Sequence, residues 1–98
     1  MIERIVKMTF KEDLVEEFLK VFESSKNQIA TFNGCNGLKL IQDVLHPNVL
    51  FTYSIWDSED HLNEYRNSQL FNETWARTKI LFKDKPAAWS ANVIDFVK

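Results

Sequence analysis

The feature that most limits the possible folds is the spacing of apolar residues, which alternates between two periods along the chain. Residues 2–10 and 88–97 show an apolar alternation with a period of two, so each segment is predicted to be a strand. Residues 11–31 instead carry Leu14, Phe18 and Phe22 at a spacing of four, which predicts an amphipathic helix. The chain is therefore predicted to begin with a strand and a helix and to end with a strand.

Turn residues divide the middle of the chain. Gly34 and Gly37, each preceded by Asn, end the first helix, because Gly and Asn accept the backbone angles of tight turns. A strand is expected over about residues 38–44, and His46-Pro47-Asn48 turns the chain into a further strand at residues 49–56. These two strands are predicted to form an antiparallel hairpin.

A second helix follows the hairpin. Asp57 or Ser58 can cap its start, a break is expected near Asn67-Ser68, and Pro86 is expected to end it. The order strand, helix, strand, strand, helix, strand predicts an α+β fold of the ferredoxin-like βαββαβ type. In this fold, two helices cover one face of a four-stranded antiparallel sheet.

The strand at residues 49–56 is apolar on both sides. Leu50 and Trp56 belong to one side, while Phe51, Tyr53 and Ile55 belong to the other. Two helices can cover only one face of a sheet, so the second face needs another cover. In a chain of 98 residues, a second copy of the same chain is the simplest candidate, and we expect a homodimer.

Composition limits the class of protein. A length of 98 residues with 45% hydrophobic residues fits a single domain over residues 1–98. The net charge of −2 is spread without a basic stripe, so nucleic acid and membrane surfaces are not expected partners. The N-terminus lacks the pattern of a signal peptide, and Cys35 is the only cysteine, so a cytoplasmic location is expected.

Common motifs for metals, nucleotides and serine hydrolases do not occur in the sequence. It contains no His-x-x-x-His, Cys-x-x-Cys, Gly-x-Gly-x-x-Gly or Gly-x-Ser-x-Gly. We therefore expect neither a metal nor another cofactor. The expected site is an apolar cleft between helices and sheet, with a few polar groups pointing into it.

Residues 34–71 carry a recognisable combination of features. They begin with a Gly-Cys-Asn-Gly turn and contain a strand that ends in Trp56-Asp57-Ser58 immediately before a helix. This segment resembles the antibiotic biosynthesis monooxygenase domain, a family of small dimeric α+β barrels. The resemblance implies oxidation of a phenolic or quinol substrate by dioxygen, without metal or flavin, in a cleft of the kind expected here.

Five residues are candidates for the site. His61 and Tyr65 lie four residues apart on the second helix and are the candidate catalytic acid-base pair. Trp56, Phe71 and Trp75 are the candidate substrate-binding residues, since their rings could pack against a planar substrate. The structural alternatives are a buried core position for Trp56, a solvated ring for His61, and simple packing for Tyr65.

Three other residues bear on alternative kinds of site, namely a haem site, a nucleophilic cysteine and an anion-binding arginine. Trp75 lies near the position where the resemblance to haem-degrading relatives implies an iron-ligating His, and an indole cannot ligate iron. Cys35 has no adjacent activating base and is interpreted as a small buried hydrophobe. Arg66 could anchor an anionic substrate, but a surface ion pair is the preferred interpretation.

The sequence thus predicts a cofactor-independent monooxygenase that acts on a small aromatic substrate, a quinol or polyphenol, with dioxygen. One alternative is a non-catalytic dimeric ligand-binding or accessory protein of the same fold. A third hypothesis is cyclase or isomerase chemistry on an aromatic substrate in the same cleft.

Overall fold

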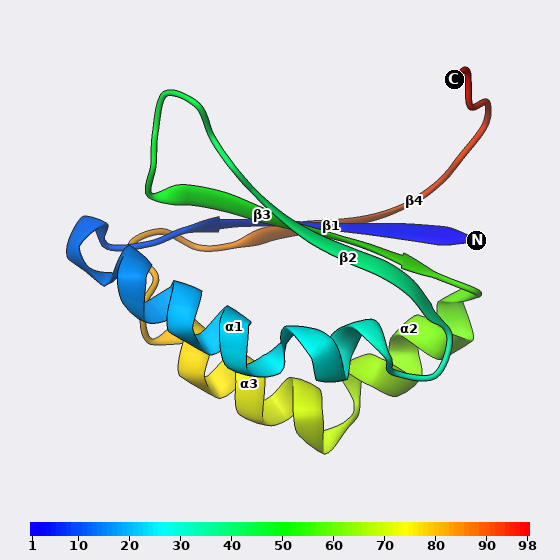
Figure 1. The fold of residues 1–98 in the computed structure, drawn as a ribbon, viewed down its shortest axis with the longest axis horizontal. Coiled ribbons are helices and arrows are strands. Elements are labelled where there is room, and N and C mark those ends of the chain that lie inside the picture. The colour runs from blue at the N-terminus through cyan, green and yellow to red at the C-terminus, as the bar shows by residue number, and fades with distance from the viewer.

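A four-stranded antiparallel sheet forms one layer of the protein in a computed structural model that describes all of residues 1–98 (Figure 1). Its strand order is β2-β3-β1-β4, so the first strand lies in the interior of the sheet. The strands are β1 (Ile2–Thr9), β2 (Cys35–Gln42), β3 (Val49–Trp56) and β4 (Ala87–Asn92). This arrangement confirms the predicted ferredoxin-like α+β fold.

The helices all cover the same face of the sheet (Figure 1). They are the short 3₁₀ helix η1 (Glu12–Leu14), α1 (Val15–Ala30), α2 (Glu59–Arg66) and α3 (Gln69–Lys79). Ser58 and Ser68 cap α2 and α3, because their hydroxyl oxygens accept from the backbone N–H groups of His61 and Phe71. The predicted break in the second helical segment is therefore confirmed at Asn67 and Ser68. No helix is both long and apolar enough to cross a membrane.

Three predicted ends and one predicted start were wrong. The strand expected from about residue 38 starts at Cys35, so Gly37 lies inside β2, at an irregularity in its pairing with β3, rather than in a turn. The second helical segment ends at Lys79 rather than at Pro86, because Phe82 leaves the helix to pair with Phe10. The strand expected at residues 38–44 ends at Gln42, because the carboxylate of Asp43 accepts from the next backbone N–H groups and turns the chain.

The third wrong end is that of the last strand, which was expected to reach residue 97. It ends at Asn92, which is paired with Ile2 at the start of β1. Beyond Asn92 the edge strand has no neighbour with which to exchange hydrogen bonds, so the apolar alternation continues without a strand.

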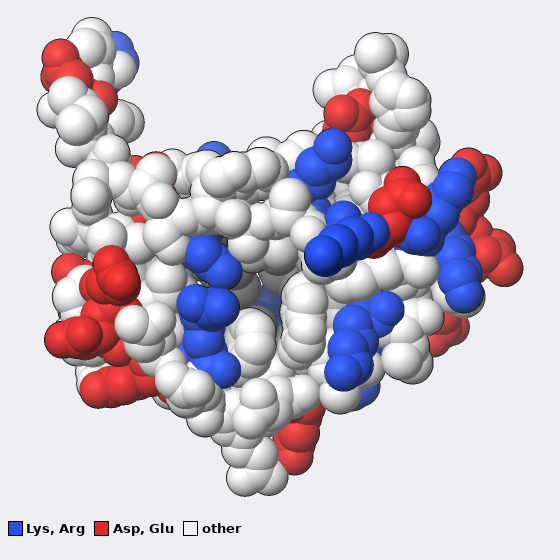
Figure 2. All heavy atoms as spheres, turned by 180° about the vertical axis from the view of Figure 1, so that it is seen from behind, with Lys and Arg blue, Asp and Glu red and all other residues white.

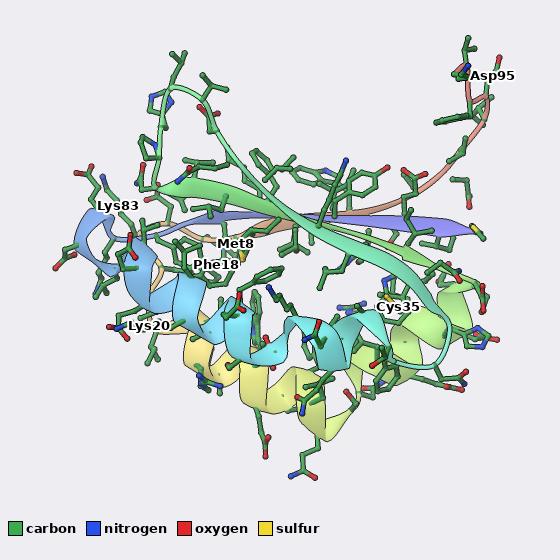
Figure 3. All side chains as sticks on the ribbon, viewed as in Figure 1. Met8, Phe18, Lys20, Cys35, Lys83 and Asp95 are labelled. Carbon is green, nitrogen blue, oxygen red and sulfur yellow. The ribbon has the colours of Figure 1, made fainter.

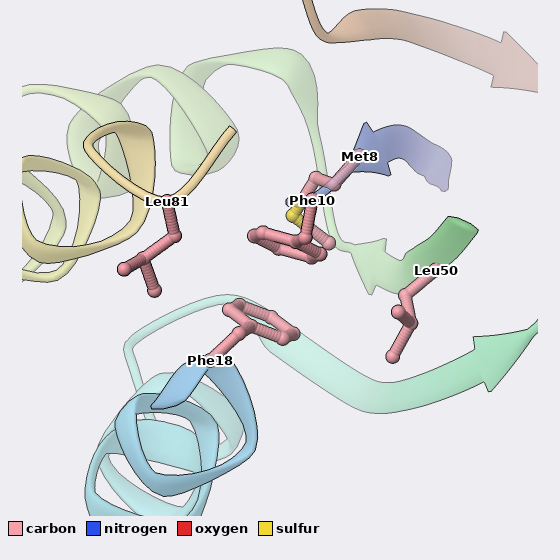
Figure 4. Close-up of a cluster of buried hydrophobic side chains, with 5 residues drawn as sticks. All are labelled: Met8, Phe10, Phe18, Leu50 and Leu81. Atoms are coloured by element: carbon pink, nitrogen blue, oxygen red, sulfur yellow. The ribbon is translucent and has the colours of Figure 1, made fainter. Parts of the chain in front are cut away.

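The buried core lies between the sheet and α1. Figure 4 shows its five side chains, which are Met8, Phe10, Phe18, Leu50 and Leu81. The rings of Phe10 and Phe18 are stacked with centroids 4.4 Å apart. In Figure 3, Met8 and Phe18 point toward each other from the sheet and the helix. This cluster closes one end of the helix–sheet layer.

The opposite face of the sheet has no helical cover. Val49, Phe51, Tyr53 and Ile55 of β3 face this side and are only half-buried, as the two-sided pattern predicted. Two segments rise from the same side, the β2–β3 loop and the C-terminal residues 93–98 (Figure 1). Both carry exposed apolar side chains, including Leu45 at 81% and Phe96 at 83% exposure.

Candidate functional site

A cavity of about 370 Å³ lies between the helices and the covered face of the sheet. Of its 21 lining residues, 13 are hydrophobic, so the cavity suits a mainly apolar ligand of modest size. Pro86, Ala87 and Ala88 at the start of β4 and Thr74 and Thr78 of α3 form part of the lining. Figure 2 shows this side of the molecule, with a hollow in the surface.

An aromatic wall runs along the cavity. The Tyr65 ring stacks on Trp56 with centroids 5.0 Å apart, and the Phe71 ring meets Tyr65 edge-on at 5.3 Å. Trp75 stacks on Phe71 in turn, with the ring planes only 9° apart. Tyr65, Phe71 and Trp75 all line the cavity, so three of the five predicted site residues come together there.

Trp56 supports this wall from behind. Its side chain is fully buried, and its indole N–H donates to the hydroxyl oxygen of Ser54 at 2.9 Å. Trp56 is not among the lining residues of the cavity, whereas Tyr65, whose ring is stacked on the indole, is one of them. The indole therefore holds the Tyr65 ring in position and does not itself face the cavity.

Tyr65 is the one lining residue of the cavity that carries a phenol hydroxyl. Burial, with a smaller contribution from nearby Cys35, raises the pKa of Tyr65 to about 12. No protein group forms a hydrogen bond with this hydroxyl, and every completely buried side-chain oxygen has a partner, so the hydroxyl oxygen is not completely buried. Near neutral pH the group is a protonated hydrogen-bond donor without a protein acceptor.

His61 lies outside the cavity lining. Its Nδ1 atom is 2.7 Å from the hydroxyl oxygen of Ser58, which also accepts from its backbone N–H. The imidazole packs on Gly34, whose φ of 89° lies in the left-handed region, and a Cβ atom there would collide with the ring. The i, i+4 spacing puts His61 and Tyr65 on one side of α2, but the His61 ring lies against Gly34 and Ser58, while Leu62, Tyr65 and Arg66 of the same helix line the cavity.

Several polar residues of the cavity were not predicted from the sequence, and the role of Arg66 was predicted wrongly. Arg4 lines the cavity, although its place in the alternation of β1 was the only signal for an inward-facing position. Arg66 also lines the cavity and has no carboxylate within 4 Å, so the predicted surface ion pair was wrong. Thr52 and Ser54 of β3 add hydroxyl groups to the lining.

Cys35 begins β2 and is half-buried rather than fully buried. Burial raises the pKa of its thiol, and a smaller effect of the Gly37 backbone opposes this shift. A thiol with a raised pKa is a poor nucleophile near neutral pH. No three His, Cys, Asp or Glu side chains converge in a way that could hold a metal ion.

Comparison with known proteins points to one family. The sequence model described as antibiotic biosynthesis monooxygenase matches residues 1–77. No protein with a curated description matches the sequence of the chain.

Solved structures share the fold at low sequence identity. A conserved protein from Methanosarcina mazei Go1 is 20% identical, with a TM-score of 0.88 over 92% of this chain and 89% of that one. A structure described as an antibiotic biosynthesis monooxygenase is 12% identical, with a TM-score of 0.90 over 97% of this chain and 100% of that one. Rv0793 from Mycobacterium tuberculosis is 15% identical, with a TM-score of 0.89 over 99% and 98%. At these identities the likeness concerns the fold alone.

Proposed function

The chain belongs to the antibiotic biosynthesis monooxygenase family, and from this premise we propose that it is a cofactor-independent monooxygenase that oxidises a quinol or polyphenol with dioxygen. The observation that carries the proposal is the cavity, whose aromatic wall includes Tyr65, a residue whose hydroxyl has no hydrogen-bond partner in the protein. A flat aromatic substrate would pack against Phe71 and Trp75, and one of its oxygens would accept a hydrogen bond from Tyr65.

The proposed reaction needs no external reductant. The phenolate form of the substrate gives one electron to dioxygen, and the substrate radical and superoxide then combine to form a peroxide. Cleavage of the O–O bond leaves one oxygen atom on the ring and releases the other as water. For a benzene-1,4-diol, the products are a hydroxyquinone and one water molecule, so the substrate itself supplies both electron pairs.

Tyr65 would act by stabilising the substrate anion. Phenols have pKa values near 10, so most of a bound quinol is neutral at pH 7. A hydrogen bond from a neutral donor to the phenolate oxygen favours ionisation and the electron transfer that follows. Since the pKa of Tyr65 is about 12, its hydroxyl keeps its proton in this role. We assign no proton transfer to His61, because the contacts of its ring are with Ser58 and Gly34.

The assembly that we propose is a homodimer formed through the open face of the sheet. Three observations support it: the half-buried apolar side chains of β3, the half-exposed Trp89 of β4, and the two apolar segments that rise on that side. A Phe51→Glu variant should be monomeric in analytical ultracentrifugation at micromolar concentration, where the unsubstituted protein should sediment as a dimer. A monomeric unsubstituted protein would contradict this assembly.

The function is tested by oxygen consumption with a panel of reduced quinones and polyphenols. Protein treated with EDTA and dialysed should retain its activity, and ¹⁸O₂ should place one labelled atom in the product. Release of hydrogen peroxide without incorporation of label would identify an oxidase instead. A protein that binds such aromatics but consumes no oxygen would support the non-catalytic ligand-binding alternative.

A further inference from the structure

Two arginines at the cavity have no acidic partner. Arg4 comes from β1 and Arg66 is the last residue of α2, and both line the cavity. The Nη1 atom of Arg4 donates to the hydroxyl oxygen of Ser90 at 3.0 Å, while the guanidinium of Arg66 has no hydrogen-bond partner in the protein. The three ion pairs of the protein lie elsewhere, at Lys20, Lys26 and His46.

The local sequence keeps carboxylates away from both guanidinium groups. Arg4 is paired across the sheet with Ser54 on one side and Ser90 on the other, so its immediate neighbours on that face are hydroxyls. One helical turn before Arg66 lie Leu62 and Asn63, neither of which is acidic. The acidic residues of α2 occupy other positions of the helix, so neither charge is neutralised within the fold.

The two charges also lie near each other. Burial and, to a smaller degree, the charge of Arg66 lower the pKa of the Arg4 guanidinium. An arginine side chain nevertheless stays protonated in proteins, so both groups remain cationic. Two neighbouring cations beside an apolar cavity repel each other until an anion binds between them. Figure 2 shows basic side chains next to the hollow on this side of the molecule.

We propose that Arg4 and Arg66 bind the carboxylate of an aromatic acid whose ring lies in the cavity. A guanidinium presents parallel N–H donors that match the two oxygens of a carboxylate, and the pair of arginines offers more donors than one carboxylate requires. The ring of such an acid would extend toward Phe71 and Trp75, which line the same cavity. This inference rests on the proposed function and deepens it, because it makes the substrate a hydroxylated aromatic acid rather than a neutral quinol.

The test uses a ligand that binds without turnover. Binding of 1-hydroxy-2-naphthoate and of its neutral methyl ester would be measured by calorimetry under anaerobic conditions. We expect the acid to bind about 10- to 100-fold more tightly than the ester, as expected for hydrogen bonds to a charged group. Raising the salt concentration should weaken binding of the acid and leave binding of the ester nearly constant.

Arginine variants then locate the anion site. Arg66→Gln and Arg4→Gln should each weaken binding of the acid about 10-fold or more and change binding of the ester less than about twofold. Arg77→Gln is the matched control, because Arg77 lies on α3 outside the cavity lining and contacts Ser24. Should Arg4→Gln fail to fold, Arg66→Gln decides the matter, since Arg66 is exposed at the end of its helix.

The proposal is overturned if acid and ester bind equally, if the acid does not bind at millimolar concentration, or if Arg66→Gln weakens both ligands alike. Its failure is separate from failure of the proposed function. Oxidation of neutral quinols without preferred binding of the acid would remove only the carboxylate site. Arginine-dependent binding of the acid in a protein that consumes no oxygen would remove only the oxygenase activity.

Discussion

The two ends of the helix–sheet layer are both aromatic, but only one of them is closed. At the closed end, Phe10 and Phe18 are stacked and almost completely buried, at 0% and 4% exposure. Phe18 reaches the edge of the cavity, whereas Phe10 lies outside its lining. At the open end, Tyr65, Phe71 and Trp75 also pack ring against ring, yet each borders the cavity. Aromatic packing therefore serves stability at one end and shapes a binding site at the other.

The polar groups account for this difference. At the closed end, the five core side chains bring no charge and no hydroxyl. At the open end, Arg4, Tyr65 and Arg66 line the cavity, and burial raises the pKa of Tyr65 to about 12. A residue of the closed end should thus affect mainly folding, and a residue of the open end mainly function.

The largest expected effect is the loss of a ring at the closed end. Phe10→Ala should lower the free energy of unfolding by about 3–5 kcal/mol, because it leaves a cavity among fully packed side chains. Phe71→Ala is the matched truncation at the open end and should cost roughly half as much or less, since Phe71 already borders empty space. Urea denaturation measures both values, and equal costs would remove the distinction between the two ends.

Alkaline pH should reveal the buried phenol of the open end. The pKa of Tyr65 is about 12 in the folded protein and about 10 when unfolded, so the folded state holds this proton more tightly. The resulting stability is fully present below pH 10 and is lost as the pH rises through 12, by about 2–3 kcal/mol. Denaturation of the unsubstituted protein and of Tyr65→Phe at several pH values isolates this contribution. Parallel pH profiles of the two proteins would contradict it.

Tyr65→Phe should affect function without a comparable effect on folding. We expect turnover of a reduced quinone to fall about 10- to 100-fold, as for the loss of one anion-stabilising contact. The free energy of unfolding near pH 7 should change by less than about 1 kcal/mol, because the hydroxyl has no partner in the protein. Oxygen-electrode assays give the rates.

His61→Ala is the comparison variant on the same side of α2. Because His61 does not line the cavity, its removal should lower turnover by less than about threefold. If His61→Ala lowers turnover as much as Tyr65→Phe does, the result would support the catalytic acid-base pair that the sequence predicts. Unchanged turnover in both variants would show that neither His61 nor Tyr65 takes part in catalysis.

The smallest expected effect on function is that of replacing Trp56, whose indole packs behind Tyr65. Trp56→Phe removes the N–H that donates to Ser54 and should cost about 1–2 kcal/mol of stability. Because Trp56 supports Tyr65 and does not line the cavity, KM should change less than about twofold. A large increase in KM with unchanged stability would show that the indole contacts the substrate directly.

The sequence alone determined the fold class. The alternation of residues 2–10, the spacing of Leu14, Phe18 and Phe22, and the helix break near Asn67-Ser68 all depend on neighbours close in the chain. Such local patterns also predicted the uncovered apolar face of β3 and the aromatic members of the cavity wall. Strand and helix ends were less predictable, because pairing with a distant residue decides them, as with Asn92 and Ile2 or Phe82 and Phe10.

Only the tertiary structure decided which polar groups share the cavity. Helical spacing places His61 beside Tyr65, but the imidazole packs on Gly34 and not in the cavity. This contact joins residues 27 positions apart, so helical spacing could not predict it. Arg4 and Arg66 are far apart in the sequence and line the same cavity because β1 lies in the interior of the sheet, beneath the helices. Periodicity records which face a side chain prefers, whereas the contents of a cavity depend on how separate elements are stacked.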